Sequence, residues 1–304
     1  LSDIARGTPG FSGAELAALT NEAAILAAMA EHAYVRQEDL EEARDKVRFG
    51  RQKQSRVIDP EDKRITAYHE AGHALVNLLL DHTEPLHKVT IIPRGMALGV
   101  TMMLPEKDRM HLTRNQILDE LAVSYGGRIA EETFCNDITS GASSDIQRAT
   151  QMARTMVTSW GMSDAIGPIN LSNRQGNDFL GNEFNMGNEF SDETARRVDA
   201  EVERILREAQ QRASEIIQAN EGAMHRIAEA LLEYETLSGT EVKALYDGTA
   251  SEELRHRSGQ APPPLPTPPP ASASVPAGSE VQPATPPPAP PAPPLPPRPG
   301  NEPA

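Results

Sequence analysis

Residues His69-Glu70-Ala71-Gly72-His73 combine two histidines and a glutamate within five positions, and the rest of the domain is interpreted outward from them. Residues four apart in a helix share one face, so the two imidazoles lie one turn apart. Zinc takes nitrogen ligands at about 2.0–2.1 Å, and two such histidines can reach the same ion. The carboxylate of Glu70 beside them can deprotonate a water held by that ion. The spacing therefore predicts the site of a zinc-dependent hydrolase on a helix.

The residues around the motif extend this helix in both directions. Asp59 is a good N-cap, and Pro60 suits the first helical position. The apolar run 74–80 follows the motif, so the two histidines are expected inside a long and mostly apolar helix. The alternative is a pair of core histidines satisfied by hydrogen bonds. A buried histidine pair beside a buried glutamate is costly without an ion, so the metal site is favoured.

A third ligand is needed, because a catalytic zinc site usually has three protein ligands and a water. The candidates are Glu131, Glu132 and Asp145. In many enzymes with a His-Glu-x-x-His motif the third ligand is a glutamate on a following helix. This favours Glu132, which falls on the apolar stripe of its helix. Asp145 is the rival, although an aspartate in a first helical turn is also explained by the helix dipole. Spacing alone leaves the choice open.

Composition and charge exclude some classes of protein. The chain has 304 residues and a formal net charge of −15, which argues against general nucleic-acid binding. Its one cysteine, Cys135, excludes an internal disulfide framework and is expected to be a buried, inert thiol. No apolar run reaches the ~18–20 residues of a membrane span, so this chain itself is expected to be soluble. Because it begins with Leu1 and a helical pattern starts almost at once, we expect a piece of a longer protein, and any membrane anchor or nucleotide site could lie upstream.

The expected fold is mainly α-helical with a small β-sheet. Capping boxes at Ser12, Thr113 and Ser144 each predict a helix start. The glycine pair 126–127 lies inside the second of these helices and predicts a close approach of another backbone, most naturally that of the motif helix. Runs 89–92 and 99–103 are strand candidates. A loop is expected over 170–187, and the segment after Gly259, with 20 of the 26 prolines, is expected to be disordered.

Several longer motifs, in register, resemble the FtsH family of ATP-dependent, membrane-bound zinc proteases. The resemblance covers about 6–246, and the matching stretches are 8–16, 65–74, 88–95, 97–101, 125–132, 139–145, 156–163 and 191–195. It implies four parts, namely a partial helical lid of an AAA ATPase (1–50), a linker (51–58), a zinc peptidase domain (59–247) and a proline-rich tail (248–304).

The resemblance also implies roles for individual residues. His69, His73 and Asp145 would be the zinc ligands and Glu70 the general base, while Glu131 and Glu132 would have supporting roles. In the lid, Gly13 and Ala14 would lie near the adenine of ATP.

The family further implies a homo-hexamer that degrades unfolded polypeptides at the cytoplasmic face of the bacterial inner membrane. The chain has no G-x-x-x-x-G-K-[ST] loop, so ATP and Mg²⁺ would act only through an ATPase core outside it.

Two alternative functions remain open at this stage. The first is a catalytically silent assembly or scaffold protein, although the intact set of candidate site residues argues against it. The second is a purely structural zinc site, for which Cys135 is the candidate fourth ligand. If the chain is a peptidase, the strand at 99–103 could bind its substrate as an added β-strand.

Overall fold

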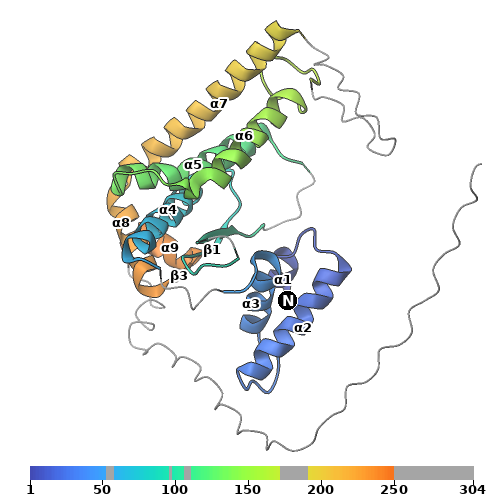
Figure 1. Ribbon diagram of the computed structural model, residues 1–304, viewed down its shortest axis with the longest axis vertical. Coiled ribbons are helices and arrows are strands. Elements are labelled where there is room, and N and C mark those ends of the chain that lie inside the picture. The colour runs from blue at the N-terminus through green and yellow to red at the C-terminus, as the bar shows by residue number, and fades with distance from the viewer. Residues whose placement is uncertain (53–57, 96–97, 106–110, 172–190, 250–304) are drawn as a thin grey trace, which may run out of the picture. The chain divides into compact units, whose positions relative to one another are not determined.

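A computed structural model describes residues 1–52, 58–95, 98–105, 111–171 and 191–249. Within these residues the chain is mainly helical with one small sheet, which confirms the expected fold class (Figure 1). The expected loop at 170–187 and the expected disordered tail fall almost entirely outside the described residues, as does most of the expected linker.

Three helices form the N-terminal part, namely α1 (Ser2–Arg6), α2 (Gly13–Met29) and α3 (Gln37–Phe49). Ser12 caps α2 with the expected capping box, since its hydroxyl accepts from the backbone N–H of Glu15. A small apolar cluster joins the three helices, and its buried members are Ile4, Leu19, Ala23 and Ala43.

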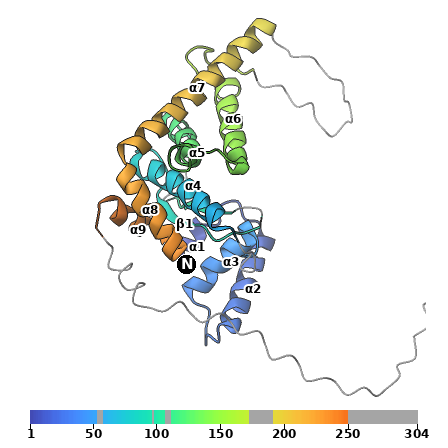
Figure 2. The same cartoon turned by 60° about the vertical axis from the view of Figure 1, so that its left-hand side comes forward.

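The motif helix α4 (Pro60–Leu79) is the centre of the second part. Asp59 caps it as expected, accepting a hydrogen bond from the N–H of Glu61 at 2.9 Å. Helix α4 packs against α5 (Arg114–Phe134) on one side and α8 (Glu221–Tyr234) on another (Figure 2). One apolar core runs through these helices, and it includes the fully buried Leu75, Ile117, Leu121, Ile227 and Leu231.

Two glycines, Gly72 and Gly126, allow the backbones of α4 and α5 to come into direct contact. A Cβ atom on Gly126 would lie 2.6 Å from the carbonyl oxygen of Gly72 and 3.0 Å from the amide nitrogen of His73. Both distances are too short for a carbon atom in van der Waals contact. The close approach predicted from the glycine pair is thereby confirmed, and it brings α5 directly beside the motif.

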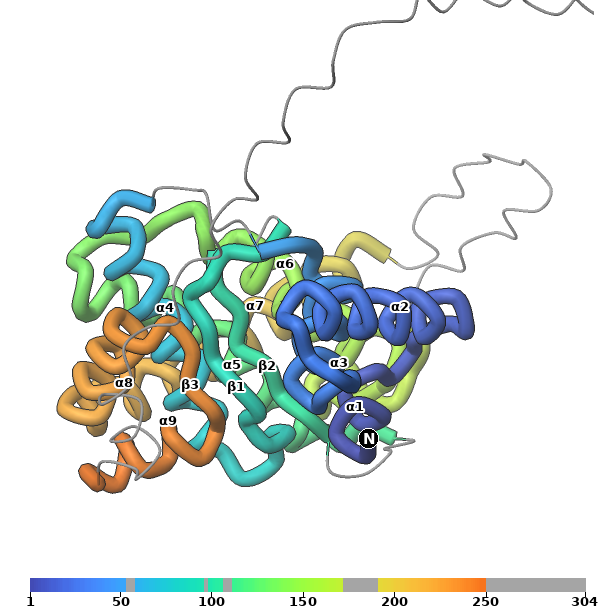
Figure 3. The backbone as a smooth tube through the Cα atoms, turned by 90° about the horizontal axis from the view of Figure 1, so that it is seen from below, coloured from blue at the N-terminus to red at the C-terminus, as the bar shows by residue number. Residues whose placement is uncertain are grey.

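The sheet has three antiparallel strands, β1 (Leu86–Thr90), β2 (Val100–Met103) and β3 (Thr236–Ser238), in the order β2-β1-β3 (Figure 3). Val89 at the centre of β1 pairs with Thr101 on one side and with Leu237 on the other. The candidate 99–103 corresponds to β2, whereas the candidate 89–92 overlaps β1 only at Val89 and Thr90, because the strand begins at Leu86 and ends before Ile91. Strand β3 was not predicted. Among the described residues β2 pairs only with β1, so it is an edge strand there.

Helix α6 (Ser143–Thr158) follows a 3₁₀ turn, η1 (Ser140–Ala142), without a break. The capping box expected at Ser144 is wrong, because Thr139 caps η1 instead and no side chain caps α6. The turn satisfies the first backbone groups of the helix and places Asp145 in its first turn.

Helix α7 (Asp192–Ala219) lies along both α5 and α6 and buries an apolar stripe against them (Figure 1). It also buries Glu201, which accepts hydrogen bonds from Ser163 at 2.7 Å and from the guanidinium of Arg204 at 2.7 and 2.9 Å. The short helix α9 (Gly239–Tyr246) follows β3. None of the helices in the described residues is both long enough and apolar enough to cross a membrane.

Candidate metal centre

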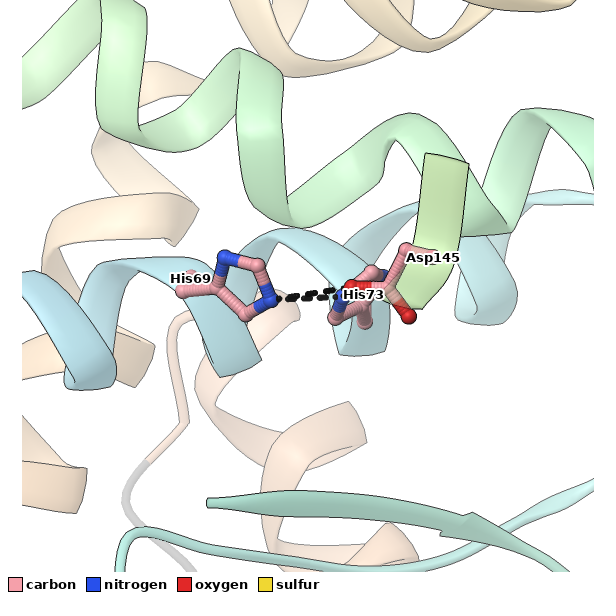
Figure 4. Close-up of side chains that lie close together, drawn as sticks. All are labelled: His69, His73 and Asp145. Atoms are coloured by element: carbon pink, nitrogen blue, oxygen red, sulfur yellow. Dashed lines mark hydrogen bonds and ion pairs between the residues drawn. The ribbon is translucent and has the colours of Figure 1, made fainter. Parts of the chain in front are cut away.

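Three candidate ligands converge between α4 and α6. The Nε2 atoms of His69 and His73 lie 3.0 Å apart, and Oδ2 of Asp145 lies 3.4 and 3.5 Å from them (Figure 4). The two imidazoles come from successive turns of α4, and the carboxylate comes from the first turn of α6. Among the described residues this is the one group of three or more such side chains whose donor atoms gather closely enough to hold an ion.

The spacing of the three donors fits a tetrahedral transition metal. Donors bound at 2.0–2.1 Å in tetrahedral geometry lie about 3.3 Å from one another. The observed separations of 3.0 to 3.5 Å bracket that value. Two nitrogens and one carboxylate oxygen also match the ligand types of a catalytic zinc site, which leaves the fourth position open.

Each histidine is held through its other ring nitrogen. Nδ1 of His73 donates to the carbonyl oxygen of Val123 at 2.7 Å, and Nδ1 of His69 donates to Oε1 of Glu131 at 2.7 Å. Both partners lie on α5. A donating Nδ1 leaves the Nε2 lone pair for an ion, so α5 selects the tautomer that a metal ligand needs.

Glu131 links two of the candidate ligands. Its side chain is almost fully buried, and its second oxygen accepts from the backbone N–H of Thr139 at 2.8 Å. Thr139 begins the turn that delivers Asp145. One carboxylate therefore orients the ring of His69 and anchors the loop that carries the third donor.

The ionisation of these groups reflects the same contacts. Burial alone would lower the pKa of His69, but hydrogen bonds to Asp145 and Glu131 raise that pKa to about 10. Burial alone would raise the pKa of Asp145, but the two imidazoles hold it well below its usual value. The site therefore stabilises positive charge at its centre, which a bound divalent cation would supply in place of a proton.

Gly127 makes room for one of the imidazoles. A Cβ atom at this position would lie 2.5–2.6 Å from three ring atoms of His69. Gly127 and Glu131 are four residues apart, so both face α4 from the same side of α5. That face of α5 shapes the site from above in Figure 4.

The carboxylate of Glu70 lies beside this group, on the side of the sheet. Glu70 is 6% exposed, and Thr101 of β2 donates to its Oε2 at 2.6 Å. A Cβ atom on Gly99 would lie 2.6 Å from its Oε1. Glu70 is thus close to the edge strand as well as next in sequence to a candidate ligand.

The other sequence candidates lie elsewhere. Glu132 is exposed and does not join the group, so the apolar stripe on which it was placed does not extend to it. Cys135 was expected to be buried, but it is only partly buried, because it lies at the C-terminal end of α5. It is also outside the group, and burial raises the pKa of its thiol. Gly13 and Ala14 are exposed at the start of α2.

The resemblance implied a supporting role for Glu131 but did not identify its partner, which is His69. Sequence reasoning missed this contact, and it also missed the roles of Val123, Thr139, Gly127 and Thr101. One signal could have found two of them. Gly127 and Glu131 are spaced by one helical turn, and the glycine pair had already placed that face of α5 against the motif helix.

The chain matches two family models. The model described as "Peptidase family M41" matches residues 56–245, and the model described as "AAA+ lid domain" matches residues 1–42.

Curated relatives agree with these matches. A protein of Methylacidiphilum infernorum named "ATP-dependent zinc metalloprotease FtsH 2" is 52% identical over 242 residues, which cover 80% of this chain and 38% of that protein. Proteins of Acidobacterium capsulatum ("ATP-dependent zinc metalloprotease FtsH") and Bdellovibrio bacteriovorus ("ATP-dependent zinc metalloprotease FtsH 1") are 47% and 49% identical. Their alignments cover 84% and 83% of this chain, and 40% and 39% of those relatives. The chain thus spans about two-fifths of the length of these relatives.

Proposed function

The chain belongs to peptidase family M41, and from that premise we propose that residues 59–247 act as a zinc metalloendopeptidase. His69, His73 and Asp145 hold the zinc, and Glu70 is the general base. The observation that carries the proposal is the convergence of two Nε2 atoms and one carboxylate oxygen within 3.5 Å, beside a buried glutamate.

Zinc held by His69, His73 and Asp145 would supply Lewis-acid polarisation of the scissile carbonyl and would lower the pKa of the attacking water. Glu70 accepts the proton of the attacking water and returns it to the leaving amine, because its carboxylate lies next to the ligand face of α4. Glu131 and the carbonyl of Val123 keep a proton on Nδ1 of each imidazole, so that Nε2 remains free to bind the metal. The site thus combines a fixed ligand set with a nearby proton carrier.

The edge strand β2 is suited to binding the substrate. It pairs with β1 alone among the described residues, and its other edge can accept an extended peptide through backbone hydrogen bonds. Thr101 of this strand contacts Glu70, so a peptide laid along β2 would pass close to the base. Backbone pairing is indifferent to most side chains, which favours unfolded polypeptide as the substrate class.

The test compares the chain with its Glu70→Gln variant on an unstructured fluorogenic polypeptide, with zinc present and ATP absent. The parent is expected to cleave the polypeptide and the variant to lose cleavage, because the amide cannot accept the proton. Zinc content and the melting temperature should be equal in both. Equal cleavage by the two proteins would refute the assignment of Glu70. No cleavage by either with zinc bound would mean that the peptidase needs the ATPase part to assemble, or that the chain is a scaffold.

A second pair of variants tests the ligand set. Asp145→Asn is expected to weaken zinc binding strongly, whereas Cys135→Ser should keep both zinc and activity. Loss of zinc in Cys135→Ser would instead support a closed, structural site.

We further propose that this chain works as part of an ATP-dependent assembly, because its relatives are named ATP-dependent zinc metalloproteases, and that this assembly is bound to a membrane. The AAA+ lid match supports a link to a nucleotide-driven ring, in which Gly13 and Ala14 would lie near the adenine. A homo-hexamer at the cytoplasmic face of the bacterial inner membrane is the expected form. Sedimentation of the complete protein with and without ATP tests this part independently of the peptidase test.

A further inference from the structure

The hydroxyl of Thr101 contacts the carboxylate that the proposed mechanism uses as a base. Its Oγ1 lies 2.6 Å from Oε2 of Glu70 and 3.3 Å from the main-chain oxygen of the same residue. A hydroxyl has one proton, and the shorter contact is to the charged acceptor, so Thr101 donates to Oε2. We propose that Thr101 is a positioning residue for the general base Glu70, an inference that rests on the proposed function.

The carboxylate is confined from its other oxygen as well. Oε1 occupies space that only a glycine at position 99 leaves free, since a Cβ atom there would lie 2.6 Å from it. Gly99 directly precedes β2 and lies two residues before Thr101, so the two residues face the same side of this extended segment. One short segment of the edge strand therefore binds one carboxylate oxygen and makes room for the other.

This arrangement selects one side-chain conformation of Glu70. A glutamate has three side-chain torsions, and the hydrogen bond from Thr101 favours the conformation in which Oε2 is bound to the hydroxyl and Oε1 lies beside Gly99. Without the hydroxyl of Thr101, the carboxylate of Glu70 could adopt other side-chain conformations. Removal of the hydroxyl should lower the rate of the chemical step rather than substrate affinity. The reason is that the hydroxyl bonds to Glu70 and not to the substrate.

The position of Thr101 also links substrate binding to the base. Thr101 pairs with Val89 of β1, and its backbone belongs to the strand on which the substrate is expected to lie. A peptide paired with β2 would hold the strand, and through it the hydroxyl, in place. A truncated substrate too short to pair with β2 should therefore be less sensitive to the loss of Thr101 than a long one.

The experiment measures kcat and KM for the parent, Thr101→Val and Thr101→Ser on the unstructured fluorogenic polypeptide. Valine keeps the shape and removes the hydroxyl, whereas serine keeps the hydroxyl. We expect kcat to fall roughly 10- to 100-fold in Thr101→Val, the range for a hydrogen bond to a charged group. KM should stay within about twofold, and Thr101→Ser should recover most of the lost kcat. The zinc affinity of both variants should equal that of the parent.

A matched control makes the same change on the same helix as the base. Thr66→Val removes a hydroxyl that bonds only to the carbonyl of Asp62, one turn below the motif. It should leave kcat and KM unchanged. If Thr101→Val retains full kcat, or if Thr101→Ser is as impaired as Thr101→Val, the positioning role is overturned.

Crystal structures of the zinc-loaded parent and Thr101→Val give a readout that does not depend on activity. The parent should show the hydroxyl bound to Glu70, and the variant should show the carboxylate displaced. An unmoved Glu70 in Thr101→Val would overturn the proposal even if the parent proved inactive. The Glu70→Gln comparison separately tests the proposed function, so the failure of one can be told from the failure of the other.

Discussion

Replacing Gly126 by alanine tests the idea that the glycine crossing of α4 and α5 builds the site. The added Cβ atom would lie 2.6 Å from the carbonyl oxygen of Gly72, and an ordinary carbon–oxygen contact needs about 3.4 Å. The obstacle is backbone on both sides, so no side-chain rotation relieves it. The two helices must therefore separate locally by about 0.8 Å.

That separation acts on the hydrogen bonds that cross between the helices. The contacts from His69 to Glu131 and from His73 to the carbonyl of Val123, both 2.7 Å, would lengthen toward about 3.5 Å, where little hydrogen-bond energy remains. Overpacking costs about 1–3 kcal/mol, and two lost hydrogen bonds cost about 1 kcal/mol each. The helix propensity of alanine returns about 1 kcal/mol, so the net loss is about 2–4 kcal/mol.

The assays are thermal unfolding and zinc competition titration. For a domain of this size each kcal/mol lowers the melting temperature by about 2–4 °C, so a fall of roughly 5–15 °C is expected. Zinc affinity should fall about 10- to 100-fold, because both imidazoles lose their orienting partners. The control is Gly222→Ala in α8, where the nearest atom to the new Cβ would be a guanidinium nitrogen of Arg226 at 3.5 Å. If Gly126→Ala matches this control in both assays, the reasoning is refuted.

Three further changes test other parts of the structure. Gly127→Ala should lower zinc affinity about 10-fold or more by pushing the ring of the first motif histidine aside, measured by the same titration. Asp145→Asn should weaken zinc binding while Glu132→Gln, at an exposed position, should not; equal effects would contradict the assigned ligand set. Glu201→Gln should destabilise the chain by about 1–3 kcal/mol near neutral pH in urea unfolding. The guanidinium of Arg204 lowers the pKa of Glu201 below 4.5, so this stabilisation is complete above that pH and is lost as the pH falls through the folded value. The difference between parent and variant should therefore shrink in acid.

The sequence was sufficient for the features that depend on one helix or one close contact. The spacing of His69 and His73 placed both rings on one face of α4, and Asp59 and Pro60 placed its start. The glycine pair predicted the approach of α4, because a glycine inside a helix needs a packing reason to offset its cost. These inferences rest on the periodicity of a helix, on its capping residues and on adjacent glycines, all of which involve residues close together in sequence.

The third ligand could not be separated from its rivals by such rules. Asp145 is 72 residues beyond His73, and its position depends on the 3₁₀ turn after Thr139 and on the anchoring of that turn by Glu131. Neither feature has a local sequence period. The same turn explains why the capping box expected at Ser144 does not form, since the helix has already begun at Ser143.

Strand β3 was missed for a related reason. It has three residues, too few for an alternating pattern, and it exists only because β1 lies beside it. The contact between Thr101 and Glu70 is likewise a product of sheet position rather than of sequence spacing. Family resemblance supplied the ligand assignment that spacing left open.

The pairing of β1 with β3 has a consequence for the order in which the protein is made. Thr90 and Thr236 bond to each other through their hydroxyls at 2.8 Å across 146 residues of chain. During synthesis, β1 emerges long before its partner, and contacts of such sequence separation form late. Until residues 236–238 leave the ribosome, β1 lacks its partner β3. Strand β2, which carries Thr101, is then paired with a strand that has no neighbour on its other side. The three-stranded sheet that carries Thr101 is therefore completed only after residues 236–238 have been translated.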